Sequence, residues 1–133
     1  MNVLVDTSAW VEYLRGTGSA HNVWIRQAIK DERPLGWTDP ILYELTAGAR
    51  SPERAHELRR LLMRGPMHPV AGLQDWEDAA HLYRSARARG LTVRSSIDCL
   101  IAAVALRSDN AILSVDRDHG ALAQVSDLEL VEP

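Results

Sequence analysis

The chain has 133 residues, a length at which one domain can bury a single core without disulfides or a structural metal. Hydrophobic residues make up 46% and charged residues 25%, which argues against a disordered, collagen-like or coiled-coil chain. The net charge of −3 gives no electrostatic sign of a passive nucleic-acid binder, and the single cysteine, Cys99, excludes a disulfide framework and a cysteine-rich zinc site.

The apolar segments are too short for a membrane protein. The longest apolar run, Cys99–Leu106, falls far short of the roughly 20 residues that a membrane span needs. The first residues reach Asp6 without a basic region, so they do not resemble a signal peptide. We expect a single domain over residues 1–133, located in the cytoplasm and without membrane contact.

Short apolar runs alternate with amphipathic helical patterns along the whole chain. The apolar runs predict five short strands, at residues 3–5, 35–37, 67–71, 111–115 and 128–131. Helical spacing and end signals predict seven helices, at about residues 7–16, 19–32, 39–49, 51–65, 75–90, 95–105 and 118–125. This alternation predicts an α/β fold, a three-layer α/β/α sandwich around a mostly parallel sheet of about five strands.

Polar residues at the expected helix starts fit capping roles. Thr7 or Ser8 can cap the first helix, and Asp39, followed by proline, can cap the third. Asp75 and Ser95 each resemble the first residue of a capping box. In parallel sheets the functional crevice lies at the carboxyl ends of the strands, so the residues there are the candidates for chemistry.

Acidic residues gather at those ends. Asp6 follows the first strand, Asp116 and Asp118 follow the strand at 111–115, and Glu44 and Asp98 lie in the early turns of two helices. If the sheet forms as expected, all five reach one rim. Carboxylates this close repel one another unless a cation is present, and an oxygen set without cysteine or histidine suits Mg²⁺ or Mn²⁺ better than zinc.

Each carboxylate also has a purely structural interpretation. Asp6 could cap a helix, Asp98 could interact with the N-terminus of its helix, and Glu44 could lie on a solvated face. Asp116 and Asp118 could form a polar turn. The functional interpretation is favoured because four separate segments would otherwise have to bring carboxylates to one rim by accident.

Four sequence blocks carry a resemblance to a known family: LVDTSAW (4–10), ILYEL (41–45), VRSSIDCLIAA (93–103) and LSVDRD (113–118). In order and spacing they resemble PIN-domain ribonucleases, in particular VapC-type toxins of bacterial toxin–antitoxin systems, over nearly the whole chain. Two positions depart from the family pattern. Ser114 stands where threonine is common, and His119 stands where an aromatic residue is frequent, which leaves open whether Asp116 or Asp118 faces a metal.

The resemblance implies a Mg²⁺-dependent endoribonuclease toxin that cleaves cellular RNA and thereby inhibits translation and growth. Asp6, Asp98 and Asp116 would hold Mg²⁺, with Mn²⁺ as a substitute, and Glu44 would orient or deprotonate the attacking water. Secondary roles near the metal or a phosphate fall to Thr7, Ser8, Ser114 and Asp118. From their places beside the motifs, Arg94 and Arg117 could contact RNA phosphates or remain solvated charges.

The resemblance also implies two protein partners, a cognate VapB-type antitoxin and a second copy of the chain. Trp10 and Trp24, in the first two helices, offer a candidate homodimer interface. The five histidines are scattered without the spacing of metal ligands, and we expect them at the surface.

Two other functional classes stay open. A phosphoryl-accepting receiver or an aspartyl phosphatase also uses Mg²⁺ at the end of a strand, but these proteins need a lysine at the phosphate, and Lys30 lies far from every acidic motif. A phosphatase would also have a second carboxylate where Ser8 stands. A non-catalytic module could instead bind a basic partner in the acidic pocket, and it would neither need metal nor cleave RNA.

Overall fold

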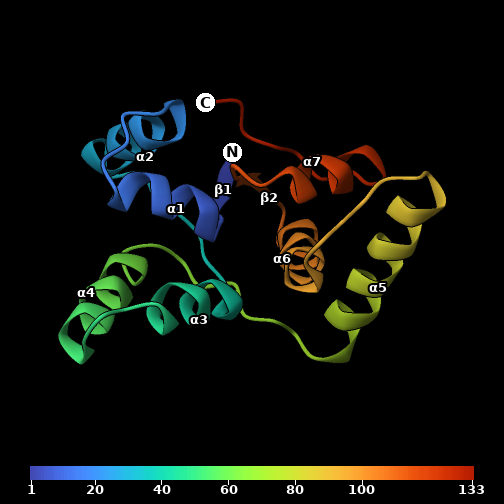
Figure 1. The fold of residues 1–133 in the computed structure, drawn as a ribbon, viewed down its shortest axis with the longest axis horizontal. Coiled ribbons are helices and arrows are strands. Elements are labelled where there is room, and N and C mark those ends of the chain that lie inside the picture. Colours follow the sequence, from blue (N-terminus) through green and yellow to red (C-terminus); the bar gives the residue numbers. More distant parts are fainter.

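The structure, a computed structural model, describes all residues from 1 to 133. The elements along the chain are β1 (Asn2–Val5), α1 (Thr7–Leu14), α2 (Ala20–Lys30), α3 (Asp39–Ala47), α4 (Pro52–Leu62), α5 (Leu73–Ala88), α6 (Ser96–Arg107), β2 (Asn110–Leu113) and α7 (Arg117–Gln124). All seven predicted helices are present, with ends that differ from the prediction by a few residues. Figure 1 shows α1 and α2 on one side of the two strands and α5, α6 and α7 on the other.

β1 and β2 are parallel neighbours, and residues 2–5 pair in register with residues 110–113. Three further segments extend this pair through single parallel bridges, which join Leu4 to Gly36, Trp37 to Met67, and Ile112 to Leu130. The five apolar runs of the sequence therefore lie side by side, but only two of them are strands. The five-stranded sheet that we predicted is not confirmed.

Proline explains part of the missing strand structure at one edge. Pro66 and Pro69 flank the bridge residue Met67, and proline has no N–H to donate to a neighbouring strand. Two hydrogen bonds remain between these segments, from the Trp37 N–H to the Pro66 carbonyl (3.1 Å) and from the His68 N–H to the Trp37 carbonyl (2.7 Å). They hold the segments together without building a longer ladder.

The core lies between the two strands and the helices that cover them. β1 and β2 are buried apart from the exposed Asn2, and apolar apart from Asn2 and Asn110. Residues 98–105 of α6 are all buried, which fits a helix covered by α5 and α7. None of the helices is both long and apolar enough to cross a bilayer. The carboxyl ends of β1 and β2 point to the same rim because the strands are parallel.

Serine side chains cap α2, α4 and α6, and the cap of α6 by Ser95 was predicted. The Ser51 hydroxyl accepts the Arg54 N–H at the start of α4, and the Ser95 hydroxyl accepts the Asp98 N–H at the start of α6. Each bond satisfies one N–H that has no partner inside its helix.

Three other expected caps are wrong. Asp6, rather than Thr7 or Ser8, is the N-cap residue of α1, and its side chain makes no capping bond there. Thr38 precedes α3, which frees the Asp39 carboxylate to accept the Val70 N–H (2.9 Å).

The third wrong cap is Asp75, which lies inside α5. Its helix begins after Gly72, whose φ of 74° is a backbone conformation that glycine adopts without strain. The buried Asp75 carboxylate accepts the Ala71 N–H (2.7 Å) and pairs with Arg107 of α6 (2.9 Å). Asp75 therefore joins two helices and the loop before them.

Of the two tryptophans expected at a dimer interface, Trp10 is not available for one. Trp10 is buried in the core, and Trp24 is half-buried, with the Arg33 guanidinium 5.0 Å from its ring centre. These side chains face inward because α1 and α2 pack against each other and against the core. Two large aromatic side chains, Trp76 and Tyr83, are exposed on α5.

Candidate functional site

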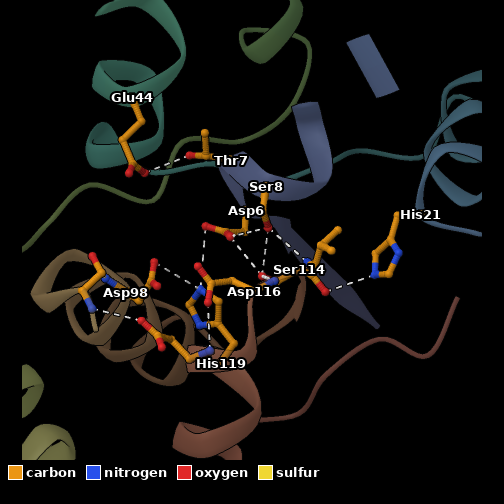
Figure 2. Close-up of polar contacts among 12 residues, drawn as sticks. Asp6, Thr7, Ser8, His21, Glu44, Asp98, Ser114, Asp116 and His119 are labelled. Atoms are coloured by element: carbon orange, nitrogen blue, oxygen red, sulfur yellow. Dashed lines mark hydrogen bonds and ion pairs between the residues drawn. The ribbon is translucent and has the colours of Figure 1, made fainter. Parts of the chain in front are cut away.

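Three elements bring the acidic side chains to one rim. Asp6 follows β1 directly, Asp116 follows the end of β2, and each is the N-cap residue of the next helix. Asp98 comes from the first turn of α6. Figure 2 shows these side chains converging around His119, while Glu44 lies on the other side of Asp6.

Two hydroxyl groups hold the Asp6 carboxylate. Asp6 is 3% exposed, and its Oδ2 accepts hydrogen bonds from the hydroxyls of Ser8 (2.8 Å) and Ser114 (2.9 Å). The same hydroxyl oxygens accept the N–H groups of Val115 and Asp116, each at 3.0 Å. The start of α1 is thereby tied to the end of β2, and the structure brings Ser8 and Ser114 to Asp6.

His119 is the functional side chain that sequence reasoning missed. It is fully buried rather than at the surface, and its Nε2 lies 3.7 Å from an oxygen of Asp6 and 3.7 Å from an oxygen of Asp98. These separations are too long for hydrogen bonds but close enough for strong electrostatic attraction. The signal for its burial was helical spacing, because His119 is three residues before the buried Leu122 on α7.

Asp98 is the most strongly perturbed carboxyl group of the cluster. Burial raises the pKa of Asp98 to about 8, repulsion by Asp6 and Asp116 acts in the same direction, and attraction by His119 opposes them. Its Oδ2 is buried and has no hydrogen-bond partner. A cation bound here would give this buried oxygen a partner. It would also relieve the repulsion among the neighbouring carboxylates.

Asp6 and His119 stabilise each other's charged forms. Burial opposes the charge on Asp6, but His119 and the two serine hydroxyls together hold the pKa of Asp6 below its ordinary value. Burial also opposes the charge on His119, yet attraction by Asp6 and Asp98 raises its pKa. Each charge of this buried pair therefore favours the other, so an ionised Asp6 and a protonated His119 stabilise each other.

Asp116 and Asp118 differ in what they contact. Asp118 is buried, and its Oδ2 accepts the N–H groups of Arg94 and Ser95, each at 3.0 Å, which fixes the loop before α6. Asp116 is exposed and uses one oxygen to accept the Asp118 N–H (2.9 Å). The side chains of Arg94 and Arg117 have no ion-pair partner.

Glu44 lies apart from the main cluster. It is exposed on α3, and its Oε1 accepts a hydrogen bond from the Thr7 hydroxyl (2.8 Å). Since Thr7 is adjacent to Asp6 in the chain, this bond connects Glu44 to the edge of the acidic cluster. Glu44 shares no close ligand group with the aspartates.

The residues present fit a hard divalent cation. Two groups of residues could each hold an ion, Asp6–Asp98–His119 and Asp98–Asp116–Asp118. Within each group the ligand atoms lie within 4.8 Å of one another. Carboxylate oxygens dominate both groups, which is the chemistry that Mg²⁺ and Mn²⁺ prefer. The nitrogen of His119 is the one departure from the all-oxygen set that the sequence predicted.

Comparison with known proteins identifies the family of the chain. The PIN domain family model matches residues 3–126. A VapC ribonuclease of Mycobacterium bovis and the ribonuclease VapC11 of Mycobacterium tuberculosis are each 40% identical to the chain over 128 residues, which is 96% of both sequences.

Solved structures share the fold at low identity. VapBC2 from Rickettsia felis, bound to promoter DNA, superposes with a TM-score of 0.75 at 16% identity, over 98% of each chain. DNA-bound VapBC from Salmonella typhimurium gives 0.76 at 12% identity, over 98% of this chain and 97% of that one. The chain therefore belongs to the PIN domain family and, within it, to the VapC group.

Proposed function

We propose that the chain is a Mg²⁺-dependent endoribonuclease and the toxin of a VapBC-type toxin–antitoxin pair. The observation that carries this proposal is the position of Asp98, whose buried Oδ2 has no partner and which belongs both to a close ligand group with Asp6 and His119 and to one with Asp116 and Asp118. The 40% identity to proteins named VapC ribonucleases supports the same activity.

Asp6, Asp98 and Asp116 would hold the ion, with Asp118 as a further oxygen donor. When bound, Mg²⁺, or Mn²⁺ in its place, supplies a water of lowered pKa and positive charge beside the scissile phosphate. Ser8 and Ser114 keep Asp6 ionised and oriented through their hydroxyls. These hydroxyls act before any substrate arrives, so the site is preorganised.

Glu44 is the residue we assign to the attacking water. Its carboxylate is exposed and accepts from the Thr7 hydroxyl, which leaves its second oxygen free to orient the water and take its proton. The water oxygen then forms a bond to phosphorus as the bond to the leaving oxygen breaks, and the leaving oxygen takes up a proton from solvent to become a hydroxyl. Arg94 and Arg117, beside Asp118, would contact the phosphates of the RNA strand.

We propose two protein partners. The VapBC complexes among the structural neighbours support a VapB-type antitoxin for this chain. A second copy would pack on the outer face of α5, because Trp76 and Tyr83 are 50% and 41% exposed there. The cytoplasm, where cellular RNA is translated, would be the site of action.

The test is cleavage of total cellular RNA by the purified protein, with and without EDTA, followed by sequencing of the new ends. We expect discrete cuts in Mg²⁺ that disappear with the chelator, and arrest of growth when the chain is expressed alone. A non-catalytic module that binds a basic partner would leave the RNA intact under both conditions. Cleavage that continues in EDTA would contradict the metal-dependent mechanism.

A further inference from the structure

A groove with a basic rim lies directly beside the acidic cluster. It has a volume of about 700 Å³ and is lined by residues of α1, α3 and α4 and of the loop between α3 and α4. Figure 1 shows α1 facing the pair formed by α3 and α4, where this groove lies. Its charged lining consists of Arg15, Arg50, Arg54 and Glu44.

The groove is continuous with the candidate active site. Thr7 and Glu44 both line it, and the hydrogen bond between them (2.8 Å) lies at the end nearest Asp6. Figure 2 shows Thr7 and Glu44 on one side of Asp6, with Asp98 and His119 on the other. An extended ligand that passes the acidic cluster on this side therefore enters the groove.

Two of the arginines are free to bind a ligand. Arg54 forms an ion pair with Glu57 (3.0 Å), whereas the exposed side chains of Arg15 and Arg50 have neither a hydrogen bond nor an ion pair. Glu44 is the only acidic residue that lines the groove, and Thr7 already occupies one of its oxygens. The groove thus carries excess positive charge although the whole chain has a net charge of −3.

We propose that this groove binds the sugar–phosphate backbone of the RNA strand beside the cleaved bond, with Arg15 and Arg50 on successive phosphates. The proposal rests on the ribonuclease activity proposed above. The acidic cluster lies next to a groove with positive charge, and this arrangement favours RNA. One phosphate can contact a cation held by the aspartates while the neighbouring phosphates contact the guanidinium groups. An acidic peptide would be attracted by the arginines but repelled by Asp6 and Asp116.

The test compares wild type with Arg15→Gln/Arg50→Gln, which removes both charges and keeps the side-chain length. The matched control is Arg60→Gln, because Arg60 is exposed on α4 and does not line the groove. Binding of a fluorescein-labelled single-stranded RNA is measured by anisotropy in EDTA at several salt concentrations, and cleavage of the same RNA is measured in Mg²⁺.

For the double variant we expect about tenfold weaker binding and about tenfold higher KM, with kcat nearly unchanged. The slope of log affinity against log salt concentration should fall by about 1.4, since each phosphate contact on a single strand contributes about 0.7. The control should match wild type in every measurement.

Three results would overturn the inference. Unchanged RNA affinity and salt slope in the double variant would show that the groove takes no phosphates. If the double variant binds RNA as wild type does but no longer co-purifies with the co-expressed antitoxin, the groove binds a protein segment instead of RNA. RNA that wild type neither binds nor cleaves would instead remove the ribonuclease proposal itself, and the groove assignment with it.

Discussion

Replacing Asp98 with asparagine separates the charge of this residue from its place in the fold. The Asp98 backbone N–H bonds to the Ser95 hydroxyl, and this cap is retained in the variant. The side chain is 8% exposed and faces Asp6, His119 and the carboxylates that follow β2. Asparagine keeps the shape and removes one negative charge from a crowded site.

The sign and size of the stability change follow from the pKa of Asp98, which burial raises from 3.8 to about 8. Because the folded state holds this proton more tightly than the unfolded state, the carboxyl group costs stability as pH rises from 4 to 8. Between pH 4 and pH 7 that cost reaches roughly 4 kcal/mol, at about 1.4 kcal/mol per pH unit. Burying the asparagine amide in the variant itself costs about 1–3 kcal/mol, which offsets part of the gain from removing the charge.

We therefore expect the metal-free variant to be more stable than wild type by about 1–3 kcal/mol at pH 7, which raises Tm by roughly 3–12 °C. The difference should shrink to near zero at pH 5. Thermal unfolding is followed by circular dichroism in EDTA at pH 5, 6, 7 and 8, with Asp127→Asn, an exposed aspartate outside the cluster, as the control. A variant that is less stable than wild type at pH 7 would refute the reasoning.

Three further predictions concern other contacts. Arg107→Ala leaves the buried Asp75 carboxylate without its ion-pair partner and should lower the free energy of unfolding in urea by about 3 kcal/mol at pH 7. Because Arg107 holds the pKa of Asp75 below its ordinary value, this loss of stability should fade below about pH 4. His119→Gln should lower metal-free stability more at pH 6 than at pH 9, since the raised pKa of His119 makes its stabilisation greatest at low pH; equal losses at both pH values would contradict this. Trp76→Glu should disrupt the proposed homodimer and give a monomer by light scattering, with a far-UV circular dichroism spectrum like that of wild type, because Trp76 is 50% exposed in the single chain.

Local patterns predicted most of the acidic site. Asp6 and Asp116 follow the ends of parallel strands, and Asp98 follows a serine cap, so their positions predicted that they would meet once these strands paired. Ser8 and Ser114 were expected nearby, and the structure shows why they matter, since both hydroxyls bind Asp6.

Features that depend on distant contacts could not be predicted in this way. The burial of His119 depends on packing between α6 and α7, which no local pattern shows fully. Trp10 looked available for a partner but lies in the core beneath α2, and the strand expected around Met67 is limited to one bridge by its neighbouring prolines. The basic groove combines residues from three helices and a loop that are far apart in sequence.

The central claim is that these carboxylates support metal-dependent cleavage of RNA. The most direct measurement is the cleavage rate of one defined RNA after EDTA treatment and stepwise return of Mg²⁺, for wild type and Asp98→Asn at equal, folded concentrations. We predict that Mg²⁺ restores cleavage by wild type, and that the variant stays at least about a hundredfold slower at every concentration. Equal rates for the two proteins, or cleavage by wild type that needs no Mg²⁺, would contradict the account.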